Sequence, residues 1–309
     1  MNEIERIERR ITLHDMRVLM AVLQAGSMGQ AATRLATSQP AVSRSIAQLE
    51  GALGVRLLDR SSKGIEPTAY GRALVKRGLV VFDELAQGIK DMEVLADPTS
   101  GELRVAASIA VAGGFVSRVI DRLTRRHPRL AFWVLATDSA TAYRALVERE
   151  VDLVVGHLIG PIGQEQVDVE ILFHDPHVVV AGVQNPWTRR RRMKLADLMH
   201  EPWVLPAPDA PYGSVVLEAF RSCGLDLPHT VVTSTLPVRR ALLATGRFLT
   251  MVPRVVVQFS TSDERLKSLP IALPATSKPL AIIRVKNRTL TPAAQLFTEY
   301  ARILAKSRA

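Results

Sequence analysis

Cysteine is nearly absent from the chain, and its scarcity limits what the protein can be. Cys223 is the only cysteine among 309 residues, so an internal disulfide and a cysteine-rich metal site are both excluded. A redox switch that pairs two cysteines of one chain is excluded for the same reason. We expect Cys223 to be a small residue on the flank of a helix.

Long apolar runs are also missing. No stretch of eighteen consecutive apolar residues occurs, which argues against a transmembrane helix. Residues 1–6 alternate in charge, unlike the basic and apolar regions of a signal peptide. With 47% hydrophobic and 23% charged residues, the composition is that of a globular protein. We therefore expect no membrane partner and a cytoplasmic location.

The motifs that mark common enzymes are absent as well. We find no nucleophile elbow, no glycine-rich nucleotide loop and no His-Glu metal pattern. His174, Asp175 and His177 lie close together, but such spacing at the start of a strand is weak evidence for a metal. The sequence thus predicts no enzyme activity, no cofactor, and neither a catalytic nor a metal site.

The clearest pattern in the chain lies between Ser27 and Thr68. The sequence predicts an alanine-rich helix over residues 28–35, a second helix over 39–53 and a short hairpin over 56–67. A polar break at Thr37 and Ser38 separates the two helices. This order is typical of a helix-turn-helix followed by a wing.

The second of these helices has two different faces. Its apolar residues recur at steps of four, three and four, which places them on one stripe facing a core. The opposite face is small and polar, so it suits the DNA major groove, although it is also compatible with a surface helix that merely faces water. The expected DNA contacts on the helix and wing are Ser38, Gln39, Pro40, Ser43, Arg44, Gln48, Arg60 and Lys63.

The distribution of charge supports DNA binding only locally. The net charge is +10, but residues 1–100 carry 13 basic and 12 acidic side chains, and the remainder carries 27 and 18. Most of the excess, 27 − 18 = +9, therefore lies outside the helix-turn-helix. Between Gln30 and Arg77 the balance is 8 − 3 = +5, and this local surface suits phosphate.

Several motifs in this region resemble the DNA-binding signature of the LysR-type transcriptional regulators. They are residues 25–32, the run 38–46 with Leu49-Glu50, residues 53–60, and Thr68-Ala69-Tyr70-Gly71. Many members have Leu-Phe-x-Arg in the wing where this chain has Leu57-Leu58-Asp59-Arg60, a change that affects packing more than DNA contact. The resemblance implies a transcription regulator that binds double-stranded DNA and a small-molecule effector and acts on RNA polymerase. A fainter similarity to the branch that regulates genes of sugar-binding proteins adds a sugar-like effector as an option.

A long helix is predicted to follow the wing, over residues 68–97. Its apolar residues alternate steps of three and four, which forms a heptad seam with Gly78 as its weak position. Such a stripe is too long to be buried on a small winged domain, so we expect it to pair with a second copy of itself; packing against the chain's own C-terminal part is the alternative. A homodimer, pairing further into a homotetramer, would be held by Val75, Phe82, Leu85, Ile89 and Met92.

The rest of the chain alternates predicted strands and helices, which indicates α/β layers around a mainly parallel sheet. It resembles the two-lobed, periplasmic-binding-protein-like effector domain of LysR-type regulators. The predicted fold is thus a winged helix-turn-helix, a linker helix and an α/β effector domain. The predicted parts are a DNA-binding domain (1–67), the linker and dimerisation helix (68–97), a hinge (98–101) and an effector domain (102–309) with lobe I at 102–167 and 271–309 and lobe II at 168–270.

Ligands of open α/β sheets bind beyond the carboxyl ends of the strands. That rule selects the pairs Ser108 and Ile109, Thr137 and Ser139, and His157 and Ile159, and the resemblance adds Phe248 and Thr250. The hydroxyl groups are equally explained as helix caps, and the imidazole as a group packed beneath the cleft. Asp138, if it lines the cleft, would disfavour an anionic effector and suit hydroxyl groups.

The most basic segment of the chain is Arg189-Arg190-Arg191-Arg192-Met193-Lys194. It is either a solvated loop, a contact to flanking DNA phosphates, or a contact to an acidic patch of another subunit. An enzyme and a purely architectural DNA binder are the alternative functions, and the large second domain argues against the latter.

Overall fold

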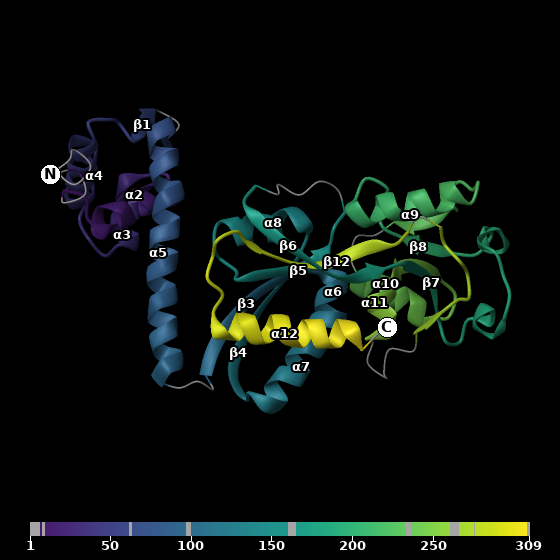
Figure 1. Cartoon of the computed structure of the whole chain (residues 1–309). Helices are drawn as coiled ribbons and strands as arrows, with labels where there is room; N and C mark the ends of the chain where they lie inside the picture. The colour runs from purple at the N-terminus through teal and green to yellow at the C-terminus, as the bar shows by residue number, and fades with distance from the viewer. Residues whose placement is uncertain are drawn as a thin grey trace. The chain divides into compact units, whose positions relative to one another are not determined.

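The computed structural model describes residues 7, 10–61, 64–96, 100–159, 165–232, 236–259, 266–274 and 276–307. The chain divides into two compact units, residues 1–89 and 90–309, and each is described by itself (Figure 1). Among the described helices, none is long and apolar enough to cross a membrane.

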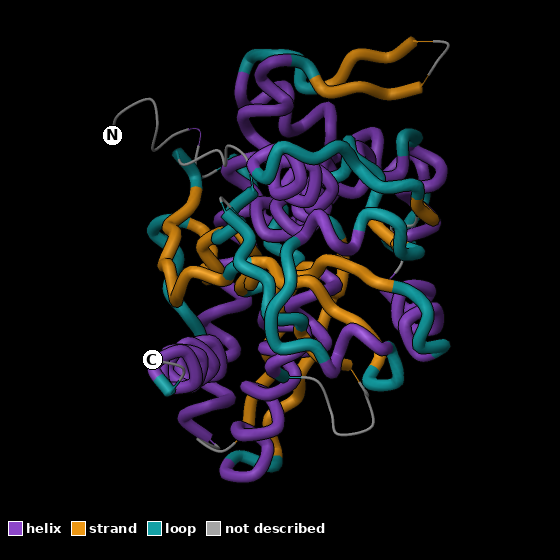
Figure 2. The backbone as a smooth tube through the Cα atoms, turned by 90° about the vertical axis from the view of Figure 1, so that its right-hand side faces the viewer, coloured by secondary structure: helices purple, strands orange, loops and turns teal. Residues whose placement is uncertain are grey.

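The N-terminal unit contains the predicted helix-turn-helix and wing. Ser27 and Ser38 each cap the helix that follows them, and Gly54 ends the second of these helices in the left-handed conformation. The wing strands project beyond the helices (Figure 2). The elements are α2 (Leu13–Ala25), α3 (Met28–Arg34), α4 (Gln39–Leu53), β1 (Leu58–Ser61), β2 (Gly64–Pro67) and α5 (Ala69–Ala96), the last of which continues into the second unit.

The start of α5 is fixed to the base of the wing. The Thr68 backbone N–H donates to the Leu57 carbonyl at 2.9 Å, and the Thr68 hydroxyl donates to the Arg56 carbonyl at 2.8 Å. The same hydroxyl accepts the N–H of Gly71 at 3.0 Å. A side chain at Gly71 would place its Cβ 2.1 Å from the Leu57 carbonyl oxygen, so only glycine allows this close approach.

The second unit is built on two five-stranded sheets. The first has the order β4-β3-β5-β12-β6 and the second the order β11-β7-β10-β8-β9. The strands of the first are β3 (Ser100–Ser108), β4 (Arg129–Thr137), β5 (Leu153–His157), β6 (Val167–Asp175) and β12 (Lys278–Val285). Those of the second are β7 (His177–Gly182), β8 (Trp203–Leu205), β9 (Thr230–Val232), β10 (Leu249–Pro253) and β11 (Leu266–Ser268).

Helices cover both faces of the first sheet because side chains alternate along its strands. On β3, Leu103 and Val105 belong to the core beneath α7 and α12, whereas Ala106 faces α8 (Figure 1). The first core also contains Val180 and Val252 of the second sheet, so the two lobes share apolar packing. The helices are α6 (Ile109–Val111), η1 (Ala112–Val116), α7 (Ser117–Arg126), α8 (Ser139–Val147), η2 (Pro186–Arg189), η3 (Leu195–Leu198), α9 (Pro211–Ser222), α10 (Leu236–Ala244), α11 (Arg254–Gln258) and α12 (Pro292–Lys306).

Three expectations for this unit need correction. The sheets are mixed rather than mainly parallel, since β12 runs antiparallel to both of its neighbours and β7 to both of its own. Strand β6 pairs with β12, so the first lobe extends to Asp175 instead of ending at residue 167. Ser100 and Gly101 of the predicted hinge belong to β3, and residues 97–99 lie outside the described residues.

Candidate DNA-reading and effector sites

Helix α4 buries one side and leaves the predicted reading side open. Val42, Ile46 and Leu49 are each 1% exposed in the core of the N-terminal unit. The predicted contact residues Ser38, Gln39, Pro40, Arg44 and Gln48 are exposed, and Ser43 is half-buried. In the wing, Arg60 lies in β1 and Lys63 lies outside the described residues.

A buried carboxylate fixes α4 against α2. Asp15 forms a capping box with Thr12 at the start of α2 and also accepts a hydrogen bond from the Ser45 hydroxyl of α4. Burial pushes the pKa of Asp15 upward, but the hydrogen bonds from Ser45 and Thr12 outweigh it and hold the pKa below its ordinary value. Asp15 therefore stays ionised at neutral pH and keeps the two helices in register.

The far end of α4 is tied to the wing. Glu50 accepts the backbone N–H groups of Leu57 at 2.7 Å and Leu58 at 3.2 Å through one carboxylate oxygen. Helix α4 is thus held at its middle by Asp15 and near its C-terminal end by Glu50, which fixes the direction in which its exposed side chains project.

The predicted seam of α5 divides into two halves. Val75 packs against the core of the N-terminal unit, and the guanidinium carbon of Arg17 lies 5.1 Å from the centre of the Phe82 ring. Further along, Leu85, Ile89 and Met92 are 46%, 53% and 70% exposed. The first half of the seam is therefore covered by the chain itself, and the second half is open.

In the second unit, Ser108 and His157 both contact Tyr212, a residue that is not among the predicted effector contacts. The Tyr212 hydroxyl of α9, in the second lobe, lies 3.0 Å from the Ser108 hydroxyl and 3.0 Å from His157 Nδ1, both in the first lobe. His157 Nε2 lies 2.9 Å from the Asp175 carboxylate, which also accepts the Val255 N–H. A buried polar network therefore joins the two lobes.

The proton positions in this network follow from its carboxylate. Because Asp175 accepts a backbone N–H, it acts as the acceptor for His157, and Nε2 carries the proton. The Tyr212 hydroxyl donates to the Ser108 hydroxyl and also lies within hydrogen-bond distance of His157 Nδ1. Burial raises the pKa of Tyr212 to about 12, so its hydroxyl keeps its proton.

The other predicted effector residues occupy different surroundings. Thr250 is fully buried and donates to the Val204 carbonyl at 2.6 Å within the second sheet. The Thr137 hydroxyl lies 3.3 Å from Asp138, which caps α8 through the N–H groups of Ala140 and Thr141. The Asp138 carboxylate is thus occupied by a helix N-terminus. The remaining positions are Ile109 and Ser139, both exposed, and Ile159 and Phe248, both half-buried.

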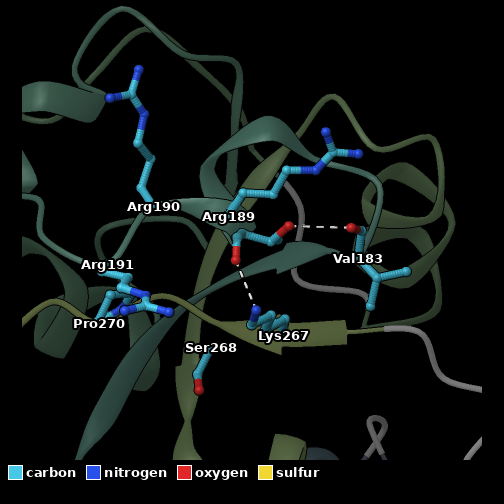
Figure 3. A pocket seen from close by; sticks show the side chains of 8 residues that line it. Val183, Arg189, Arg190, Arg191, Lys267, Ser268 and Pro270 are labelled. Atoms are coloured by element: carbon cyan, nitrogen blue, oxygen red, sulfur yellow. Dashed lines mark hydrogen bonds between the residues drawn. The ribbon is translucent and has the colours of Figure 1, made fainter.

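The basic run lies beside a surface hollow of about 670 Å³ in the second lobe (Figure 3). Arg189 and Arg190 point in different directions there, and Arg190 reaches over the Trp187 ring at 6.0 Å. Lys267 donates to the Thr188 carbonyl at 2.7 Å, and the Thr188 hydroxyl donates to the Val183 carbonyl at 3.2 Å. These bonds hold the loop in place, whereas its arginine side chains spread outward.

The described residues contain no group of three histidine, cysteine, aspartate or glutamate side chains arranged to hold a metal ion. Of the three residues close together in sequence, Asp175 binds His157, and His177 lies near the Thr276 carbonyl. Cys223 is exposed directly after α9.

Comparison with known protein families decides the identity of both units. The bacterial regulatory helix-turn-helix protein, lysR family, matches residues 13–72. The LysR substrate binding domain matches residues 96–305, which is more than half of the chain. The chain belongs to the LysR family of transcriptional regulators. It is a DNA-binding transcription regulator with a substrate-binding domain for an effector.

Relatives and solved structures agree with the family. The chain is 26% identical to the transcriptional regulator GbpR of Azospirillum brasilense over 94% of this chain and 85% of the relative. It is 24% identical to TdcA of Escherichia coli over 92% of this chain and 90% of the relative. These LysR relatives are named as transcriptional regulators, not enzymes.

The fold is shared with full-length LysR regulators of known structure. A full-length OxyR variant from Pseudomonas aeruginosa superposes with a TM-score of 0.66 at 22% identity, covering 95% of each chain. CbnR in complex with its target DNA superposes with a TM-score of 0.56 at 21% identity, covering 96% of this chain and 100% of CbnR. At these identities the likeness concerns the fold alone.

Proposed function

We propose that this LysR regulator reads its operator through the exposed side of α4 and the wing. The observation that supports this assignment is the separation of α4 into a buried apolar stripe and an exposed polar side that begins at Ser38. Gln39, Ser43 and Arg44 contact base edges in the major groove, and the first N–H groups of α4 face a phosphate. Arg60 reaches toward the minor groove, and Lys63 neutralises phosphate.

Replacing Arg44 by alanine tests this reading. Arginine discriminates bases through paired hydrogen bonds, so its loss lowers specificity by about 1–3 kcal/mol at one base position. Selection from a randomised DNA library, with wild type and Arg44→Ala side by side, measures this preference. Arg126→Ala, an exposed arginine at the end of α7, is the control and keeps the wild-type preference. An unchanged preference in Arg44→Ala contradicts the role of Arg44.

We further propose that two copies join through α5, so that two reading helices engage successive major grooves. Pairing of such dimers gives a homotetramer on DNA. Effector binding then changes the relation between the dimers, which alters the bend of the DNA or the contact with RNA polymerase. Because its target is chromosomal DNA, we place the protein in the cytoplasm.

The effector site, in this proposal, is the region between the lobes around Ser108, His157 and Tyr212. The supporting observation is that a single hydroxyl bridges two lobes by hydrogen bonds that a ligand with donors and acceptors can replace. A ligand that inserts there changes the spacing of the lobes, and this gives the effector a physical means of acting on the rest of the molecule.

Replacing Tyr212 by phenylalanine tests the inter-lobe site. The change keeps the ring but leaves Ser108 and His157 without their shared partner, so we expect a loss of about 1–3 kcal/mol in unfolding free energy. Urea denaturation measures this loss, and the DNA affinity without effector stays within about twofold of wild type. Tyr300→Phe, in α12 with its ring edge-on to His127, is the control. A Tyr212→Phe protein as stable as wild type would show that the network does not join the lobes.

A further inference from the structure

Arg239 of α10 is a buried cation that has no partner among the described residues. Its side chain lies in the second lobe and the residue is only 9% exposed. Its Nε atom is buried and makes no hydrogen bond. Within the described part of the chain, no oxygen accepts a hydrogen bond from Arg239, and no carboxylate forms an ion pair with it.

Such an arrangement is costly for the folded protein. A buried guanidinium without a counter-charge loses its hydration and gains no compensating interaction, so buried arginines are normally paired. Burial accordingly lowers the pKa of Arg239. The contrast with Arg288 is informative, because that buried arginine pairs with Asp152 at 3.0 Å. Arg288 thus has a buried carboxylate as its partner, whereas none of the described residues supplies one to Arg239.

Arg239 lies close to the network that joins the lobes. Its charge interacts with Tyr212, the residue that bridges Ser108 and His157. The carboxylate of the network, Asp175, is occupied by His157 and by the Val255 N–H. The cation therefore acts on the proposed effector region while no described acidic group there neutralises it.

A second unsatisfied group lies against the same tyrosine. His177 is 2% exposed, and its ring centre lies 5.9 Å from that of Tyr212. Burial lowers the pKa of His177 to about 4, so the ring is neutral at pH 7. Its Nδ1 donates to the Thr276 carbonyl at 3.2 Å, which leaves Nε2 as a buried acceptor without a donor among the described residues.

We propose that the effector is a small anion, a carboxylate or a phosphate ester, whose charged group pairs with Arg239. The unpaired Nε2 of His177 favours an anion that also carries a hydroxyl group, such as a hydroxy acid. This inference rests on the proposed effector site between the lobes. It also replaces the expectation that Asp138 disfavours anions, because that carboxylate caps α8.

The exposed arginines of the second lobe differ from Arg239 because their side chains are in contact with solvent. Arg189, Arg190 and Arg191 line an open hollow and their side chains diverge, so any anion attracted there stays hydrated (Figure 3). They provide a matched control, because replacing them removes three positive charges from the same lobe without touching the buried guanidinium.

The experiment measures thermal unfolding of the full-length protein against anions and neutral ligands. The probes are inorganic phosphate, sulfate, acetate, tartrate, citrate, gluconate and glucose 6-phosphate, with glucose and galactose as neutral counterparts, each titrated to 20 mM at constant ionic strength. The proteins are wild type, Arg239→Met, Arg239→Lys, Tyr212→Phe and the triple variant Arg189→Ala/Arg190→Ala/Arg191→Ala.

We expect at least one organic anion to raise the Tm of wild type and of the triple variant. Its apparent affinity falls at least about 100-fold in Arg239→Met and is partly restored in Arg239→Lys. Without anion, Arg239→Met has a Tm equal to or above that of wild type, because an apolar side chain of similar length replaces an unpaired charge. A structural role for Arg239 predicts the opposite, a lower Tm in both Arg239 variants, and would overturn the proposal.

Three other results also overturn the anion assignment, and they separate it from the effector site itself. In the first, a neutral sugar stabilises wild type and Arg239→Met but not Tyr212→Phe. This result contradicts an anionic effector and still supports an effector site between the lobes. An anion effect lost only in the triple variant assigns binding to the exposed surface. Failure of every anion to stabilise wild type removes the inference, whereas DNA reading by α4 is unaffected.

Discussion

Replacing Leu85 and Ile89 together by aspartate is expected to raise the dissociation constant of the dimer at least about 1,000-fold. Both side chains are about half exposed in the single chain, with Met92 further along the same stripe at 70%. Their burial against a second α5 would remove this apolar surface from water, and two charges there would each cost about 2 kcal/mol or more. Sedimentation equilibrium at micromolar protein concentration measures the change.

The matched control for this prediction keeps the seam apolar. Leu85→Ile with Ile89→Leu conserves volume and should remain a dimer. Loss of the dimer should also abolish tight binding to a two-half-site operator, since each monomer then engages one half-site only. If the aspartate variant sediments as a dimer, the exposed half of the α5 seam is not the interface.

Replacing Arg288 by methionine is expected to lower the free energy of unfolding of the second unit by about 3–5 kcal/mol, because it leaves a buried carboxylate without its counter-charge. The Arg288 and Asp152 side chains are 3% and 6% exposed, and Arg288 also donates to the Val151 carbonyl at 3.2 Å. The second oxygen of Asp152 accepts the Arg104 N–H at 2.9 Å. Urea denaturation monitored by tryptophan fluorescence measures the loss.

An exposed ion pair between α12 and β6 gives the control. Arg302 binds Glu170 through two nitrogens, but its side chain is 50% exposed. Arg302→Met should therefore cost no more than about 1 kcal/mol. Equal losses in the two variants would show that burial does not set the contribution of the Arg288–Asp152 pair.

The sequence was most informative where structure depends on neighbouring residues. Helix α4 begins and ends where predicted because Ser38 caps its first turn and Gly54 adopts the left-handed conformation that ends it. The family signature lies in this same region, so the regulator could be recognised before any tertiary contact was known.

Features that depend on distant residues could not be read in this way. Strand β6 pairs with β12, more than 100 residues later, and local pattern does not reveal which lobe such a strand joins. Tyr212 reaches Ser108 across 104 residues, and its position in the first turn of α9 carries no local signal. The heptad pattern also does not distinguish the two halves of the α5 seam. In the structure Arg17 covers Phe82, whereas the later positions Leu85, Ile89 and Met92 are exposed.

The bonded junction between α5 and the wing turns the helix into a lever arm. Thr68 and Gly71 lock the first turn of α5 to Leu57, so the wing cannot swivel independently of the helix. At 1.5 Å per residue, the 28 residues of α5 span about 42 Å. A tilt of only about 5° at one end of such a rod displaces the other end by about 4 Å, more than the rise of one base pair of DNA. In the proposed dimer, a small rotation where two such helices cross would therefore shift a wing by about one base pair along the DNA.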